Sequence, residues 1–285
     1  MTGAIISVWG PTGAPGRTSL AINVATELSL TGRSVALVDA DTYGGSVAGY
    51  LELFDEAPGF LATCRLADAE KFDEAHLERL SHRVVMGSAT LTVLTGTTNP
   101  GRWPELSPAR VRAGLSALAE RFEFVVVDCG FNLEEDEEIA SDLLAPRRNQ
   151  ATVSCLRASS VIIAVASAEV VGLARYIHAL DQLAVIAEEA SIVHVVNRIR
   201  RQGIAVNAGQ TVRNTLYRFA GLEHVHLIDE DVSGFHSAMV AAVPLRIANP
   251  KSAVVAQMAT LTSAVLDAST TGSTTLQEFK VPAAG

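Results

Sequence analysis

Residues 10–19 read Gly10-Pro11-Thr12-Gly13-Ala14-Pro15-Gly16-Arg17-Thr18-Ser19. An apolar run, residues 4–9, precedes this stretch, and residues 20–30 follow it with apolar side chains at helical spacing. The order is therefore strand, glycine-rich turn and helix, which is the layout of a phosphate-binding loop. Glycines let the backbone bend so that several N–H groups point inward, and the helix start adds unpaired donors and a positive dipole end. The alternative is an ordinary Gly/Pro turn.

The stretch departs from the phosphate-loop pattern GxxxxGK[ST] at two positions. Pro11 stands at the first glycine and Arg17 at the lysine. Arginine keeps the positive charge, but its planar guanidinium is bulkier than an ammonium and is not equivalent where a point charge lies between phosphates. Pro15 also has no N–H to donate. Thr18 keeps the hydroxyl that binds Mg²⁺ in this pattern.

Two further apolar runs end in aspartate. Residues 34–39 end in Asp39, with Asp41 two positions later, and residues 124–127 lead into Asp128. Because the carboxyl ends of parallel strands meet at one edge of a sheet, we expect these carboxylates beside the glycine-rich turn. There they could hold Mg²⁺, and Asp41 could orient an attacking water. The alternative for Asp39 and Asp41 is that they cap the next helix.

The rest of the chain continues the alternation of strands and helices. It predicts one α/β domain over residues 1–268, with three layers (α/β/α) around a mostly parallel, twisted sheet of about seven or eight strands, as in P-loop NTPases. The Ser/Thr/Gly-rich residues 269–285 are predicted to be a disordered tail. Further strands are expected at 91–94, 161–165, 192–197 and 224–229, and helices at 73–82, 107–121, 170–187, 231–242 and 251–267.

Composition narrows the possible classes of protein. A net charge of −9 over 285 residues disfavours binding to nucleic acid or an anionic membrane through overall charge. Cys64, Cys129 and Cys155 are far apart and lack CxxC spacing, so we expect buried thiols and no zinc site or disulfide framework. The sequence has no leader and no apolar run long enough to span a membrane, so we expect a cytoplasmic protein.

Basic residues gather only in the later part of the chain. They could contact DNA phosphates or an acidic partner, or they could form a solvated face. His224 and His226 alternate with apolar residues and are expected to be face residues and not metal ligands. The acidic residues 134–138 are expected to be a solvated helix start, with Arg147 and Arg148 beyond it. The basic residues are Arg198, Arg200, Arg201, Arg213 and Arg218.

Five motifs in order resemble the MinD/ParA family of P-loop ATPases, and the resemblance runs from residue 4 to residue 266. The sequence around Arg17 looks most like that of the divergent actinobacterial branch related to the CpaE/TadZ proteins of type IV pilus assembly. The motifs are VWGPTGAPGRTSLAINVATEL (8–28), VALVDADTYGGS (35–46), FEFVVVDCG (122–130), HVVNRIR (194–200) and LIDEDVSGFHSAMVAAVPL (227–245).

The resemblance implies that the chain binds ATP or ADP with Mg²⁺. It implies phosphate contacts from Gly13, Ala14, Gly16, Arg17, Thr18 and Ser19. It implies adenine contacts from Asn197 and Arg198, Mg²⁺ held by Thr18, Asp39 and Asp128, and catalytic roles for Arg17 and Asp41.

The resemblance also implies a nucleotide-dependent switch. The expected form is a homodimer with the nucleotide at the interface, which positions a pilus or secretion assembly and is recruited by a partner to the cell pole or membrane. The family's second lysine falls at Thr12, so with both lysines replaced we expect nucleotide binding to persist and ATP hydrolysis to be slow or lost.

Other functions stay open. One is a ParA-like partitioning ATPase that binds DNA through the region from Arg198 to Arg218. A second is a metabolic enzyme on the same scaffold, such as an amide- or biotin-pathway synthetase, whose substrate pockets have no recognisable residues here. A third is an iron–sulfur ATPase, which Cys129 beside Asp128 disfavours. Fold alone does not separate these functions.

Overall fold

Eight strands of the described residues form a single sheet in the order β3-β4-β2-β5-β1-β6-β7-β8. The computed structural model describes residues 2–54, 58–97, 99–134, 147–200 and 207–271. Neighbouring strands are parallel except β3 and β4, which are antiparallel. The strands are β1 (Ala4–Trp9), β2 (Val35–Asp39), β3 (His82–Met86), β4 (Ala89–Leu94), β5 (Phe124–Asp128), β6 (Val161–Ser167), β7 (Ser191–Ile199) and β8 (His226–Asp229).

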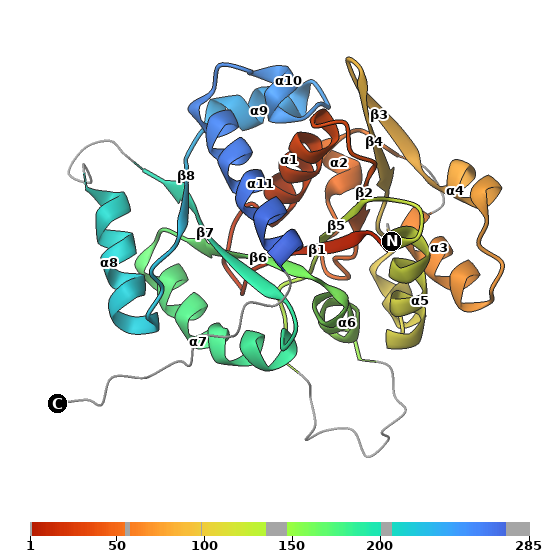
Figure 1. Ribbon diagram of the computed structural model, residues 1–285, viewed down its shortest axis with the longest axis horizontal. Coiled ribbons are helices and arrows are strands. Elements are labelled where there is room, and N and C mark those ends of the chain that lie inside the picture. Colours follow the sequence, from red (N-terminus) through yellow and green to blue (C-terminus); the bar gives the residue numbers. More distant parts are fainter. Residues whose placement is uncertain (1, 55–57, 98, 135–146, 201–206, 272–285) are drawn as a thin grey trace.

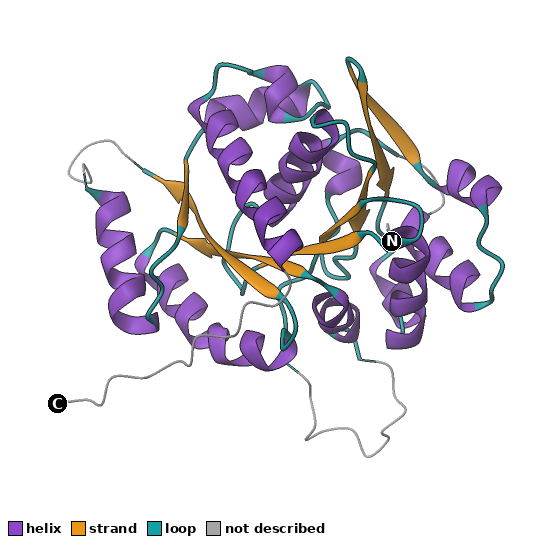
Figure 2. Cartoon of the chain, in the orientation of Figure 1, coloured by secondary structure: helices purple, strands orange, loops and turns teal. Residues whose placement is uncertain are grey.

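Helices cover both faces of this sheet (Figures 1 and 2). Helices α1 (Arg17–Leu30), α2 (Val47–Tyr50), α9 (Val232–Val240), α10 (Leu245–Ala248) and α11 (Ala253–Thr271) contribute to the apolar core on one face. The other face is covered by α3 (Gly59–Asp68), α5 (Pro108–Ala119), α6 (Gln150–Ala158), α7 (Val170–Ile186) and α8 (Ala208–Ala220), with α4 (Glu74–Leu80) and the 3₁₀ helix η1 (Pro100–Glu105) at the side. The structure is the predicted three-layer α/β/α arrangement.

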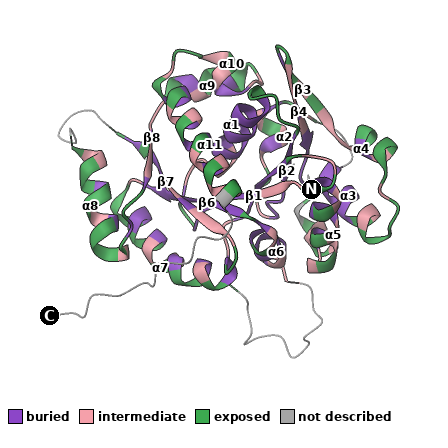
Figure 3. Cartoon of the chain, in the orientation of Figure 1, coloured by how far each residue is buried: buried purple, intermediate pink, exposed green. Residues whose placement is uncertain are grey.

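The centre of the sheet is apolar on both faces. Every residue of β2, β5 and β6 is buried, as expected for parallel strands packed between two layers of helices. Helix α1 is buried from Ser19 to Ser29, so it lies inside the fold under α11 (Figure 3). The turn that precedes α1 is therefore held between a buried strand and a buried helix.

The structure confirms the fold class and most predicted elements. The sheet is mostly parallel and has eight strands, within the predicted number. The elements that were not predicted include the antiparallel strand β3, the 3₁₀ helix η1 and the helices α6, α8 and α10. Helix α11 continues to Thr271. The predicted disordered tail lies outside the described residues from residue 272 on, as does most of the acidic run at residues 135–138.

No helix among the described residues has the length and apolarity needed to cross a membrane.

Candidate functional site

Three glycines shape the turn between β1 and α1. Gly13 and Gly16 have φ angles of 83° and 85°, in the left-handed region that glycine adopts without steric cost. Gly10 packs on β6, because a Cβ there would lie 2.4 Å from the carbonyl oxygen of Val165. These positions fix the sharp strand-to-helix turn that the sequence predicted. We call residues 10–16 the glycine loop.

The first turn of α1 presents unpaired N–H groups at the end of the glycine loop. Gly16 is the N-cap of α1 and, as a glycine, has no side chain that could make a capping hydrogen bond. The amide of Leu20 is the first to bond back, to the Gly16 carbonyl oxygen at 2.9 Å. Within the described residues, the amides of Arg17, Thr18 and Ser19 have no acceptor. They lie at the positive end of a 14-residue helix, a group of donors suited to phosphate oxygens.

Thr18 joins the glycine loop to the ends of β2 and β5. Its hydroxyl Oγ1 donates to Asp128 Oδ2 at 2.6 Å and lies 2.9 Å from Ser46 Oγ. Asp39 is directly opposite Asp128 in the β2–β5 register. The other carboxylate oxygen of Asp128, Oδ1, is buried and has no hydrogen-bond partner in the part of the chain that the structure describes. Such an oxygen is costly to bury and is a preferred ligand of Mg²⁺ or its bound water.

Burial raises the pKa of both aspartates. The pKa of Asp39 rises from 3.8 to about 7 because of burial, although hydrogen bonds from the amides of Val47 and Asp41 oppose the rise. Burial and then the neighbouring Asp39 raise the pKa of Asp128 well above its usual value, against the hydrogen bond from Thr18. A divalent cation would favour the ionised carboxylates. Asp39 also accepts the first amide of α2, so it caps that helix as well.

Arg17 is held by acceptors of the protein itself. Its Nε donates to the Cys129 carbonyl oxygen at 3.3 Å and its Nη1 to the Ala14 carbonyl oxygen at 3.1 Å. Its Nη2 lies 3.8 Å from Asp41 Oδ2, and the arginine side chain is 18% exposed. Arg17 therefore ties the glycine loop to the end of β5 and neutralises Asp41. A guanidinium has five N–H donors, and these contacts do not use all of them. The phosphate contact of Arg17 stays a prediction.

Asp41 is fixed by the turn that follows β2. Its Oδ1 accepts the amides of Tyr43 at 2.8 Å and Gly44 at 3.2 Å. Gly130, just after β5, lies so close that a Cβ on it would be 3.2 Å from this oxygen. The carboxylate thus stands between the loops after β2 and β5 with Arg17 on its other oxygen. Its role in orienting water remains a prediction.

Asn197, near the end of β7, contacts the glycine loop through its side-chain amide. Its Nδ2 donates to the Pro15 carbonyl oxygen at 3.0 Å, and its Oδ1 accepts the amide of Arg198 at 2.9 Å. A Cβ on Gly16 would lie 2.4 Å from this Nδ2, so the loop and the amide are in close contact. Arg198 is exposed and has a φ angle of 59°. The predicted adenine contacts of both residues stay predictions.

Sequence reasoning missed an aromatic contact that closes over this edge. The rings of Tyr43 and Phe131 lie 4.9 Å apart, and the guanidinium of Arg148 lies 4.2 Å from the Tyr43 ring centre. Arg148 donates to the Thr42 carbonyl oxygen at 2.7 Å, and Tyr43 Oη donates to Asn149 Oδ1 at 2.5 Å. We call these five residues the Tyr43 clasp. Its two hydrogen-bonded pairs are each 106 residues apart in the chain, so no local sequence pattern predicts it.

A second arginine that the sequence analysis missed also contacts the glycine loop. Arg175, on α7, donates from Nη1 to the Thr12 carbonyl oxygen at 3.4 Å. A Cβ on Gly13 would lie 2.8 Å from the same nitrogen. The loop is thus flanked by two guanidinium groups, Arg17 on the side of β5 and Arg175 on the side of α7.

The other candidate sites offer fewer groups that could bind a ligand. Within the described residues, no group of three or more His, Cys, Asp or Glu side chains is placed to hold a metal ion, so a Mg²⁺ here would depend on the two aspartates, Thr18 and water. All three cysteines are free and buried, as predicted. Two cavities, of about 440 and 390 Å³, lie beside β8 and beside the ends of α6 and α7, away from the glycine loop.

Solved structures with this architecture are numerous, although no protein-family model and no curated protein matches the chain. A ParA family ATPase from Chlorobium tepidum superposes with a TM-score of 0.72 at 16% identity, covering 91% of this chain and 98% of that one. The cell division ATPase MinD of Pyrococcus furiosus gives 0.68 at 17%, covering 93% and 99%. The septum site-determining protein MinD of Pyrococcus horikoshii, solved with Mg-ADP, gives 0.68 at 17%, covering 92% and 96%.

This chain has the fold of the MinD and ParA ATPases. Within that fold, the glycine loop, Thr18 and the two aspartates lie at the carboxyl edge of the sheet, where parallel α/β proteins bind ligands. The first amides of α1 can bind anionic oxygens, and Thr18, Asp39 and Asp128 can hold a hydrated cation beside them. Asp41 can hold a water near both groups. Together these groups fit a magnesium nucleotide.

Proposed function

We propose that the chain is a nucleotide-dependent switch of the MinD/ParA type, which binds ATP or ADP with Mg²⁺. The observation that supports this most is the buried Oδ1 of Asp128, which lies beside the Thr18 hydroxyl and has no hydrogen-bond partner among the described residues. A Mg²⁺ ion, directly or through its water, would satisfy that oxygen, and the free amides at the start of α1 would take phosphate oxygens. The likeness to a MinD solved with Mg-ADP supports the same ligand.

We propose further that ATP hydrolysis is slow or absent. Thr12 carries no charge, and Arg17 replaces the lysine with a group that already bonds to Ala14, Cys129 and Asp41. The site then holds fewer positively charged groups in position to stabilise the negative charge that develops during phosphoryl transfer. Steady-state turnover is expected to be low and to rise in Arg17→Lys. A fast wild-type turnover that Asp41→Ala abolishes would contradict this part of the proposal.

The switch itself is a change in oligomeric state. We expect ATP with Mg²⁺ to convert the chain to a homodimer with nucleotide at the interface, and ADP to favour the monomer. Light scattering during size exclusion measures the mass directly. The matched control is Asp128→Asn, which should stay monomeric with either nucleotide. A mass that is the same with ATP, with ADP and without nucleotide would show that the chain does not switch in this way.

The partner that such a switch would position is a pilus or secretion assembly of the CpaE/TadZ type. The sequence around Arg17 favours that branch, and recruitment to the cell pole or membrane would come from the partner. A fluorescent fusion of the wild-type chain in its native cell is expected to form polar foci, and the Asp128→Asn fusion to be diffuse. Foci that persist unchanged in the variant would show that localisation does not depend on nucleotide binding.

A ParA-like partitioning role, with DNA bound through the basic region, is the second candidate. Arg213 and Arg218 are exposed on α8, which favours it, but Arg200 pairs with Glu230 at 2.8 Å. Arg201 lies outside the described residues. DNA binding would be promoted by ATP and would weaken steeply with salt. Arg213→Glu with Arg218→Glu should then abolish it, and an absence of ATP-promoted duplex binding would reject this candidate.

A further inference from the structure

The position of Arg175 follows from how α7 leaves the sheet. Strand β6 lies next to β1, so the chain that leaves β6 emerges beside the glycine loop. Gly172, in the first turn of α7, packs so tightly on the end of β6 that a Cβ would lie 2.4 Å from Cβ of Ser167. Leu173 and Tyr176 are buried against the sheet, and Arg175 between them is exposed at the loop.

The contacts of Arg175 leave most of its hydrogen-bonding groups available. Its Nη1 donates to the Thr12 carbonyl oxygen at 3.4 Å, a long hydrogen bond to a neutral acceptor. No carboxylate of the described residues forms an ion pair with it. Arg17, by contrast, is surrounded by two carbonyl oxygens and Asp41. Of the two guanidiniums at the loop, Arg175 has fewer acceptors among the described residues and is the better placed to receive an anion.

The charge balance at the loop calls for such a group. Asp39, Asp41 and Asp128 lie at this edge, and among the described residues the ion pair of these carboxylates is that of Arg17 with Asp41. A polyphosphate would add further negative charge to the same place. Like charges a few ångströms apart repel, so binding needs cations besides Mg²⁺ and the helix dipole. Arg175 is placed on the opposite flank of the loop from the aspartates.

We propose that Arg175 is a phosphate-binding residue that supplies, from α7, positive charge to a polyphosphate held by the glycine loop. This inference rests on the proposed function, because it assigns a residue to the same site. The planar guanidinium can take phosphate oxygens in a bidentate manner once it leaves the Thr12 carbonyl. The contact would also give specificity for polyphosphates, because ligands with more phosphate groups would bind more tightly.

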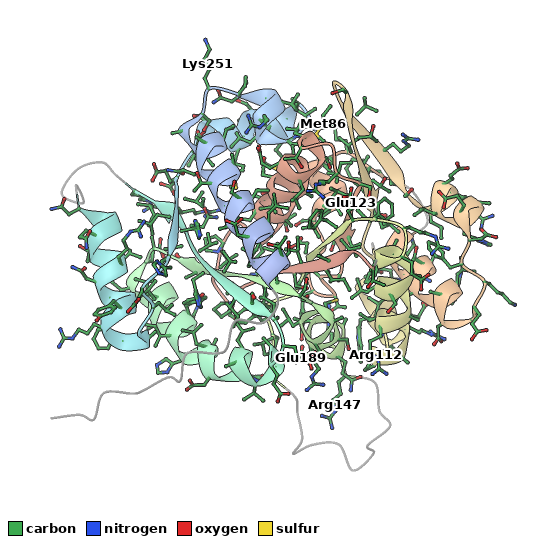
Figure 4. All side chains as sticks on the ribbon, in the orientation of Figure 1. Met86, Arg112, Glu123, Arg147, Glu189 and Lys251 are labelled. Atoms are coloured by element: carbon green, nitrogen blue, oxygen red, sulfur yellow. The ribbon has the colours of Figure 1, made fainter. Side chains whose placement is uncertain are left out.

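The test compares nucleotide affinities of Arg175→Ala and the wild-type protein by fluorescence titration with ATP, ADP, AMP and adenosine, all with Mg²⁺. We expect ATP to bind about tenfold more weakly to the variant, with a smaller loss for AMP and none for adenosine. Arg175→Lys should recover part of the ATP affinity. Arg112→Ala is the matched control, because Arg112 is an exposed helical arginine on α5 (Figure 4).

The outcomes separate the inference from the proposed function. A wild-type protein that binds no magnesium nucleotide overturns both. A wild-type protein that binds ATP while Arg175→Ala binds it equally well overturns the inference alone. A loss that is the same for adenosine and ATP, together with a lower melting temperature, would mean that Arg175 only holds the loop through Thr12. Added salt should weaken ATP binding more in the wild-type protein than in Arg175→Ala.

Discussion

At the scale of single residues, Asp128 carries the most specific chemistry. One of its carboxylate oxygens accepts from Thr18 at 2.6 Å, and the other is buried with no hydrogen-bond partner in the described part of the chain. A buried carboxylate in this state lowers the stability of the ligand-free protein, because its desolvation is not repaid by hydrogen bonds. Proteins tolerate such a cost where the group acts on a ligand. Its two effects, on stability and on binding, should therefore separate in a variant.

Asp128→Asn removes the charge and keeps the shape. Without ligand, we expect its free energy of unfolding to equal that of the wild-type protein or exceed it by up to about 2 kcal/mol. With Mg²⁺, we expect its nucleotide affinity to fall by about 10- to 100-fold, as for changes around metal ligands elsewhere. Thermal melts and nucleotide titrations measure the two effects. A strongly destabilised variant with unchanged affinity would make Asp128 a structural residue.

His194 gives a residue-scale prediction about pH. It lies in β7, shares a 2.6 Å hydrogen bond with Tyr176, and burial lowers its pKa from 6.5 to about 4. Between these values the unfolded chain takes up a proton that the folded chain does not. The contribution of His194 to stability is therefore complete above about pH 6.5 and is lost as the pH falls towards 4.

The pH prediction is measured as a difference between two proteins. We expect the free energy of unfolding of the wild-type protein to fall more steeply from pH 6.5 to pH 4.5 than that of His194→Gln, in urea titrations at each pH. Other acidic groups contribute equally to both slopes and cancel. Parallel curves would show that His194 titrates alike in the folded and unfolded chains.

At the scale of elements, the Tyr43 clasp connects three segments at the carboxyl edge of the sheet. It joins the turn after β2, the turn after β5 and the segment before α6. The first two also carry Asp41 and Gly130, which lie in contact. A movement of either turn on nucleotide binding would therefore reach α6. The clasp is therefore a structural connection from the candidate site to α6.

Arg148→Ala tests the clasp. It removes the contact with the Tyr43 ring and two hydrogen bonds to the Thr42 carbonyl oxygen, so we expect a loss of about 1–3 kcal/mol in the free energy of unfolding. Arg147→Ala is the control, because Arg147 is adjacent and points away from the body of the fold (Figure 4). Its effect should stay under about 0.5 kcal/mol. Equal effects of the two variants would show that the clasp does not stabilise the fold.

The elements that sequence reasoning found are those with a repeating apolar pattern. Strands β2, β5 and β6 are fully buried and mostly apolar, and β1 and β7 contain apolar runs that are largely buried, so the positions of these strands follow from the sequence pattern. Strand β3 was missed because its residues alternate in exposure and Val85 is 69% exposed. The two residues Gly87 and Ser88 between β3 and β4, with a φ angle of 64° at Gly87, are a hairpin signal that could have found it.

The unpredicted helices and side-chain contacts have different causes. Helix α6 is only nine residues long and buries Thr152 and Ser154 beside its apolar residues, so polarity along its sequence does not mark which residues are buried. The glycine loop, Thr18 and the aspartates were predictable because strand ends converge at one edge. The contacts of Arg175 and Arg148 were not, because they join segments that are 163 and 106 residues apart in the chain.

At the scale of the whole molecule, the site is part of the rigid centre of the sheet. The glycine loop follows the central strand β1, and Asp39 and Asp128 end the next two strands towards β3. A ligand that bridges these groups would therefore stabilise the whole domain and not a local segment. We expect a single unfolding transition that shifts upwards as magnesium nucleotide is added.

The size of that shift follows from mass action. At a free nucleotide concentration 100 times the dissociation constant, the free energy of unfolding should rise by about 2.7 kcal/mol. Calorimetric or fluorescence melts at a series of ATP concentrations measure the shift, and omission of Mg²⁺ is the control. Two separate transitions, of which nucleotide moves only one, would mean that the site belongs to a local unit.

The most direct test of the account is an isothermal calorimetric titration of the wild-type protein with ATP, in Mg²⁺ and again in EDTA. We expect saturable binding of one nucleotide per chain that is strong with Mg²⁺ and much weaker without it, because Thr18, Asp39 and Asp128 would hold the cation. Absence of saturable binding in Mg²⁺ would contradict this expectation, and the glycine loop would then be only a turn between a strand and a helix.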